Sequence, residues 1–132
     1  MKKKLLMLVF AFIAMSTAVK AQVTFTCYYR EYCDWNSYSS KFENCKGYEE
    51  SSMFVMNEKE TMFTHTIESM KSTYYVDSKE YDSKNDVYTY EVTSDVGNKY
   101  YYVFDPKNKE IRALYVKDGE TVMIRFYVKA MF

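Results

Sequence analysis

The sequence predicts an all-β protein: an antiparallel up-and-down meander of about seven to eight strands, shaped as a half-barrel or small barrel, after an N-terminal signal peptide. Aromatic residues make up 19% of the chain, and Tyr, Phe, Val and Thr favour the pleated, half-buried surface of a sheet. Short turn signals recur along the chain with runs of strand formers between them, which is typical of hairpin-linked strands. No long stretch shows the apolar spacing of a helix.

Residues 1–21 have the layout of a secretory signal peptide. Three lysines precede the apolar run Leu5–Met15, and Val19 and Ala21 form a small-residue cleavage site. The run is shorter than the roughly 20 residues needed to cross a bilayer. We therefore expect a periplasmic or extracellular protein, with membrane tethering through an uncleaved signal or a lipidated Cys27 as the alternative.

Residues 22–132 are expected to form a single all-β domain. Four of the 18 basic residues lie in the signal peptide, so 14 basic residues remain against 18 acidic ones. The absence of a long basic run argues against nucleic acid as a partner and against stable membrane insertion after signal cleavage. No motif indicates a cofactor.

The first strand is expected at "VTFTCYYREYCDWN", residues 23–36, and "KFENCKGY", residues 41–48, is a possible second. Turn signals then separate the remaining strand runs, and Asp118-Gly119 is the strongest because both residues suit a type I′ turn. These runs are 52–56, 61–66, 72–81, 87–94, 99–104, 110–117 and 120–129.

Three hairpin registers follow from the turns. The Asp118-Gly119 turn places Ile111 opposite Phe126, Ala113 opposite Ile124 and Tyr115 opposite Val122, so that one face is apolar. A four-residue loop at "DPKN" puts Tyr100, Tyr102 and Phe104 on that same face. The turn at "NEKE" is expected to pair Phe54 with Phe63 and Val55 with Met62, and to place His65 at a strand end opposite Ser52.

Arg112 and Arg125 face each other on the other side of the last hairpin. Like charges in this position are destabilising. The two side chains can extend into solvent, or neighbouring acidic groups or aromatic rings can stabilise them. Alternatively, the two guanidinium groups can bind one anionic group between them. The third reading is the sharpest hypothesis for a ligand site that the sequence offers.

Exposed aromatic side chains suggest a contact surface. Tyr101 and Tyr127 lie on the arginine face, and Trp35 is the only tryptophan. Tyrosine gives a large contact area at low entropic cost and is common at interfaces. The candidate partner-binding residues are therefore Arg112, Arg125, Tyr101, Tyr127 and Trp35.

Three cysteines lie near the N-terminus, and two are expected to pair in an exported protein. We favour a disulfide between Cys33 and Cys45, with Cys27 and Cys45 as the rival pair. The spacing fits no zinc pattern, so no metal site is predicted.

No catalytic residue is predicted. His65 is the only histidine, and nothing marks a cysteine as an activated nucleophile beside it. The adjacent Glu49 and Glu50 point to opposite faces of a strand, so they cannot converge on a substrate.

We therefore expect a small exported non-enzymatic binding domain that uses a Tyr/Arg-rich sheet face. Its partner would be a protein, a glycan or a small anionic ligand. The alternative is a small-ligand carrier with an apolar cavity inside a lipocalin-like barrel, although the Gly-x-Trp motif of lipocalins would fall at Cys33-Asp34-Trp35, where the glycine is missing. An enzyme is the third and least favoured possibility.

Overall fold

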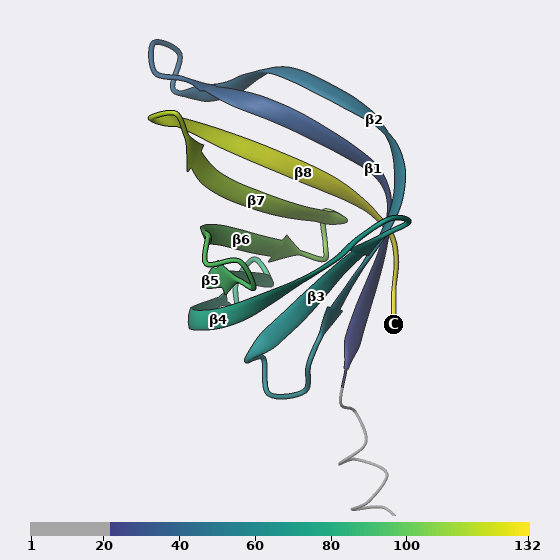
Figure 1. Cartoon of the computed structure of the whole chain (residues 1–132). Coiled ribbons are helices and arrows are strands. Elements are labelled where there is room, and N and C mark those ends of the chain that lie inside the picture. The colour runs from purple at the N-terminus through teal and green to yellow at the C-terminus, as the bar shows by residue number, and fades with distance from the viewer. Residues whose placement is uncertain (1–21) are drawn as a thin grey trace, which may run out of the picture.

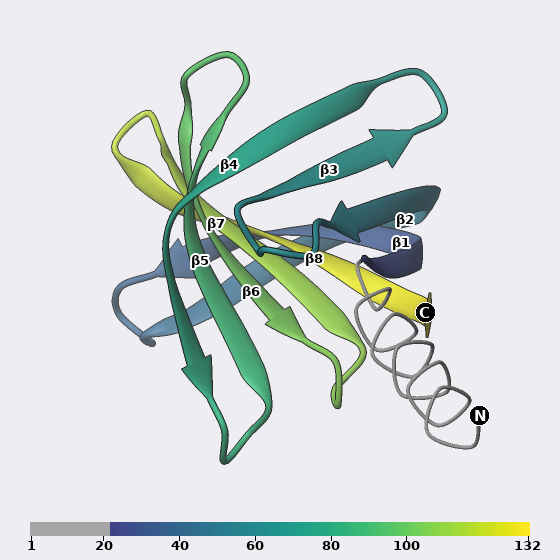
Figure 2. The same cartoon turned by 90° about the horizontal axis from the view of Figure 1, so that it is seen from below.

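The computed structural model describes residues 22–132, which form eight antiparallel strands closed into a barrel. The strands follow one another around the barrel in chain order (Figures 1 and 2). Their bounds are β1 Val23–Asn36, β2 Lys41–Met56, β3 Met62–Ile67, β4 Lys71–Asp82, β5 Val87–Ser94, β6 Lys99–Asp105, β7 Glu110–Lys117 and β8 Glu120–Met131. This is the predicted all-β meander, and the small-barrel form is the one adopted. The predicted signal peptide, residues 1–21, lies outside the described residues.

Closure of the barrel removes the two edges that an open meander would expose. β8 pairs with β1, for example Phe126 with Arg30. Beyond the last ladder pair, the backbone of Thr24 exchanges two hydrogen bonds with Phe132, of 2.7 and 2.9 Å. The C-terminal end of the chain therefore lies beside the start of β1 (Figure 1).

The interior is filled mainly by aromatic rings. Phe54 is fully buried at the centre and makes edge-on contacts with Phe104 and Phe126, at ring-centroid distances of 5.9 and 5.0 Å. Phe63 is also fully buried, 4.9 Å from the ring of Tyr102. Such edge-to-face pairs add stability beyond the burial of their area. The middle of the barrel is thus a packed aromatic core.

Two of the predicted registers are confirmed. Across the Asp118-Gly119 turn, Ile111 pairs with Phe126 and Arg112 with Arg125. Across residues 106–109, Phe104 pairs with Ile111, as the four-residue loop required. Asp118 and Gly119 both have positive φ, at 52° and 79°, as a type I′ turn demands.

The register predicted at "NEKE" is wrong by two residues. Phe54 pairs with His65 and Met56 with Phe63, so Phe63 is not opposite Phe54 and His65 is not opposite Ser52. The cause is Asn57, whose side-chain oxygen accepts hydrogen bonds from the backbone N–H groups of Thr61 and Met62 and so lengthens the loop. A shift of two preserves the face, because side chains alternate with a period of two. Phe54 and Phe63 both still point inward.

The predicted separate strands 41–48 and 52–56 are one strand, β2. The polar residues between them stay extended because β1 continues to pair with them, as in Tyr29 with Glu49. β3 pairs only with the last part of β2, from Ser52 to Met56. The paired β1 and β2 therefore reach beyond the barrel as a curved arm (Figure 1).

Candidate binding site at the barrel mouth

The predicted arginine pair lies on the outer face, where carboxylates neutralise it. Arg125 lies 2.6 Å from Glu31, and Arg112 lies 2.6 Å from Glu110 and 3.2 Å from Asp105. Glu110 also lies 3.4 Å from Nε of Arg125. The charges alternate along this network, so the two facing guanidinium groups tolerate each other through shared carboxylates.

Of the other predicted contact residues, Tyr127 joins this network and Trp35 does not. Tyr127 donates a hydrogen bond of 2.8 Å to Glu31. Tyr101 lies on the neighbouring strand β6, opposite Leu114, and is 41% exposed. Trp35 lies on the β1–β2 arm, where its ring packs edge-on against Phe42 at 5.1 Å. The outer face therefore gathers four of the five residues, and Trp35 lies apart.

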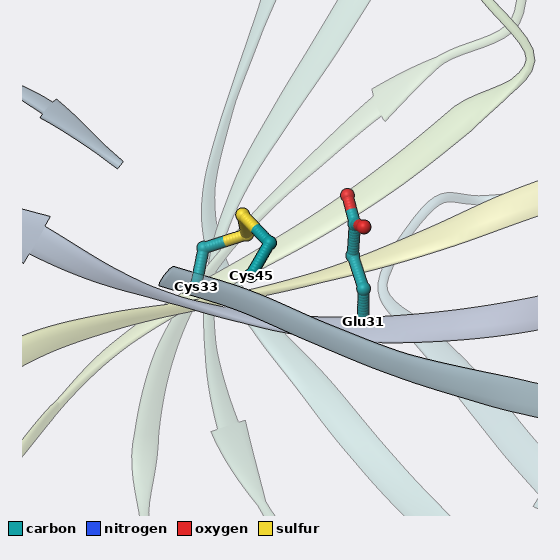
Figure 3. A group of neighbouring side chains, drawn as sticks. All are labelled: Glu31, Cys33 and Cys45. Atoms are coloured by element: carbon teal, nitrogen blue, oxygen red, sulfur yellow. A yellow bond between two sulfur atoms is a disulfide. The ribbon is translucent and has the colours of Figure 1, made fainter. Parts of the chain in front are cut away.

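The disulfide joins Cys33 and Cys45, the pair that the sequence favoured, and ties β1 to β2 within the arm. Figure 3 shows the carboxylate of Glu31 on the same side of the sheet as the two sulfur atoms, with its oxygen within 4.8 Å of them. Disulfide sulfurs are not thiolates, and Glu31 already accepts from Arg125 and Tyr127. This trio is therefore a structural cluster rather than a set of metal ligands.

A site that the sequence analysis missed lies inside the barrel, at the end that carries the turns after β1, β3, β5 and β7. We call this end the mouth. A cavity of about 260 Å³ opens there. Its polar lining includes Arg30 and His65, and its walls are mostly aromatic: Tyr32, Tyr74, Tyr100, Tyr102, Tyr115 and Phe126.

Arg30 reaches the mouth because of a β-bulge. Cys27 points into the core, and strict alternation would then turn Tyr29 and Glu31 inward. The register of β1 with both neighbouring strands shifts between Cys27 and Tyr29. This bulge places the side chains of Tyr28 and Tyr29 on the outer face, against Tyr127, and turns the side chain of Arg30 inward.

Arg30 is held by three groups at the mouth. Its Nη2 lies 2.7 Å from Glu50, its Nη1 donates a 2.9 Å hydrogen bond to the hydroxyl of Tyr32, and its guanidinium stands 4.8 Å from the ring centroid of Phe126. Burial lowers the pKa of Arg30, but the contacts with Tyr32 and Glu50 outweigh it and raise the pKa overall. The guanidinium is therefore a fixed positive charge that is neutralised locally by Glu50.

His65 lies at the floor of this cavity and is buried, inside β3 and not at the strand end where the sequence placed it. Its ring stacks on Phe54 at 4.1 Å and meets Phe126 edge-on at 4.9 Å. Burial, and then the positive charge of Arg30, lower the pKa of His65 to about 3. The imidazole is therefore neutral at physiological pH.

Two nitrogen atoms of these residues have no hydrogen-bond partner within the part of the chain that the structure describes. They are Nε of Arg30 and Nε2 of His65, both buried. Buried polar groups are nearly always satisfied in native proteins. Four further buried side-chain atoms of the described residues lack a partner, among them Oγ of Ser52 and Nε of Arg125, but Arg30 and His65 also line a cavity.

The third cysteine, Cys27, is not part of this site. It is free and 4% exposed, and burial raises the pKa of its thiol to about 12. A thiol in this state is neither a nucleophile nor a metal ligand.

Comparison of the chain with protein-family models, curated proteins and solved structures finds no match. Within residues 22–132, no helix is long and apolar enough to cross a membrane. The intramolecular disulfide is typical of proteins that fold in an oxidising, exported environment.

Proposed function

We propose that this protein is an exported, non-enzymatic binding protein that holds one small, neutral, hydroxyl-bearing molecule, such as a single sugar ring, in the mouth cavity. The observation that carries this proposal is the pair of unpartnered nitrogen atoms of Arg30 and His65 beneath an aromatic-walled cavity. Ligand hydroxyl groups are the kind of partner that both nitrogen atoms lack.

A neutral ligand is favoured over an anion because the charge of Arg30 is already matched. Glu50 lies 2.7 Å from the guanidinium, so an incoming carboxylate or phosphate would have to compete with a carboxylate of the protein. A hydroxyl group, by contrast, can accept from Nε of Arg30 while it donates elsewhere. The site is thus built for a group that both donates and accepts hydrogen bonds.

The size and walls of the cavity suit a sugar ring. A volume of 260 Å³ equals roughly nine water molecules at about 30 Å³ each. Tyrosine rings offer flat apolar faces with a hydroxyl at the tip, and they lose little conformational entropy on binding. Tyr100 and Tyr115, whose ring centroids are 5.5 Å apart, stand at one wall of the cavity.

A catalytic role is not supported by the titratable groups. His65, with a pKa of about 3, is too weak a base near neutral pH. The buried Cys27 thiol stays protonated. We therefore propose that the mouth binds its ligand and does not transform it.

Calorimetric titration of the protein with glucose and with N-acetylglucosamine tests the proposal, with sodium phosphate and acetate as anionic comparisons. At about 0.3 kcal/mol per non-hydrogen atom, a sugar of about 12 such atoms should bind with a millimolar dissociation constant. Tyr115→Phe and His65→Phe should weaken binding, while Tyr75→Phe, on the exposed surface of β4, should not. Binding of the anions alone, or equal binding by all three variants, would reject the neutral-ligand site.

A second candidate function is recognition of a partner protein by the outer face. Tyr28 is 51% exposed and lies beside Tyr127, with ring centroids 6.4 Å apart. Together with Tyr101, Arg112 and Arg125 they offer aromatic area around an ion network in which three carboxylates already contact the two guanidinium groups. Capture of a partner by the wild type and not by Tyr28→Ala, in the absence of any sugar effect, would favour this function.

A further inference from the structure

The barrel wall is incomplete between β6 and β7 near the mouth. Their pairing ends at Tyr101 with Leu114. β7 continues to Lys117 along β8, and β6 begins at Lys99 along β5. The two strands separate toward the β7–β8 turn (Figure 1), which leaves residues 99–100 and 115–117 with unpaired edges that face each other.

A groove of about 860 Å³ lies over this separation. Tyr101, Leu114 and Val116 give it an apolar surface, and Val116 is 70% exposed. Its charged lining is balanced in number, two acidic residues against two basic ones, and Asp77 lies 3.2 Å from Lys99. A groove without net charge matches a neutral occupant.

The groove and the mouth cavity share two residues, Tyr100 and Tyr115. Both residues line both spaces, their ring centroids are 5.5 Å apart, and no β6–β7 pair closes the wall beside them. A molecule that filled the mouth could therefore continue outward past these rings into the groove. Unpaired backbone N–H and C=O groups along the way can bond to hydroxyl groups.

An extended peptide is a poorer fit than a saccharide. Strand addition uses a row of edge residues, and typical strands have about 5–6 residues. The free edges here extend over two residues on β6 and three on β7. The free edges are therefore shorter than the edge that an added peptide strand would need.

We propose that the mouth and the groove form one continuous site for the end of a neutral oligosaccharide chain. The terminal ring occupies the mouth, and the next rings pass over Tyr100 and Tyr115 and lie on Tyr101 and Val116. The proposal rests on the proposed function of the mouth and extends it from a single sugar to a chain. Affinity should then rise with chain length until the groove is full.

The experiment is a calorimetric titration of the full mature chain with N-acetylglucosamine and its β-1,4-linked dimer, trimer and tetramer, and with glucose and its β-1,4-linked oligomers. We expect the trimer of at least one series to bind about tenfold more tightly than its monomer. Val116→Trp should fill the groove and remove most of that gain while leaving monomer affinity unchanged. Val96→Trp, at an equally exposed residue of the β5–β6 turn outside the groove, is the matched control and should behave as wild type.

The outcomes separate the two proposals. Monomer binding with no gain from added rings, or equal effects of Val116→Trp on monomer and trimer, would overturn the continuous site and leave the mouth site standing. Trimer binding that is insensitive to His65→Phe would show that the chain does not enter the mouth and would overturn the continuous site; the same insensitivity for the monomer would overturn the mouth site as well. Binding of acetyl-tetra-alanine amide without saccharide binding would assign the opening to peptides and also overturn both.

Discussion

The neutral, buried state of His65 has a measurable consequence for stability. Its pKa is lowered from 6.5 to about 3 in the folded protein. Below pH 6.5 His65 binds a proton in the unfolded chain but stays neutral in the folded chain. The free energy of unfolding therefore decreases as the pH falls from 6.5 toward 3. Between pH 7.5 and pH 5.0 the expected loss from this group is about 2 kcal/mol.

Urea unfolding of wild type and His65→Phe at these two pH values measures the effect. The substitution keeps a ring against Phe54, which stacks on the imidazole at 4.1 Å, and removes the titrating group. Carboxylates titrate equally in both proteins, so the comparison isolates the histidine. The wild type should lose about 2 kcal/mol more than His65→Phe between pH 7.5 and 5.0. Identical losses would mean that the imidazole is hydrated or protonated in the folded protein, and the argument for the mouth site would fail with it.

The other predictions concern the disulfide, the outer network and the free thiol. Cys33→Ser with Cys45→Ser should reduce the free energy of unfolding by roughly 3 kcal/mol for a separation of 12 residues; an unchanged urea midpoint would show that the arm folds without its tie. Glu110→Gln should cost about 1 kcal/mol, because it weakens contacts with both Arg112 and Arg125, and it should make the melting temperature rise with sulfate. A wild-type melting temperature equally sensitive to sulfate would instead support an anion site at the arginine pair. The Cys27 thiol, whose pKa is about 12, should react with an aromatic disulfide reagent only after the protein unfolds, and rapid reaction in the native state would contradict its burial.

The sequence predicts the hairpins well where the turn chemistry is local. The Asp118-Gly119 turn defines the β7–β8 register, and the alternation of Ile111, Ala113 and Tyr115 shows which face is buried. The position of Arg112 opposite Arg125 follows from that register alone. The carboxylates that neutralise this pair include Glu31, which comes from the far end of the chain, so no local pattern could identify it.

The mouth could not be predicted because it depends on irregularities. The bulge after Cys27 reverses which face of the sheet every later side chain of β1 points to. The sequence around Tyr28 has no glycine that would predict a bulge. The loop at Asn57 is set by side-chain hydrogen bonds to residues four and five positions on. Alternation from Phe63 turns His65 inward in either register, but its contact with Phe54 follows only from the observed one.

One nitrogen resonance tests the central claim most directly. His65 is the only histidine in the chain, so a ¹⁵N-histidine-labelled sample reports its imidazole without ambiguity. We predict a neutral imidazole at pH 7 whose Nε2 resonance moves when a saturating saccharide is added. A ring that is protonated at pH 7, or an Nε2 resonance that stays in place while calorimetry shows the saccharide bound, would contradict a ligand site at the barrel mouth.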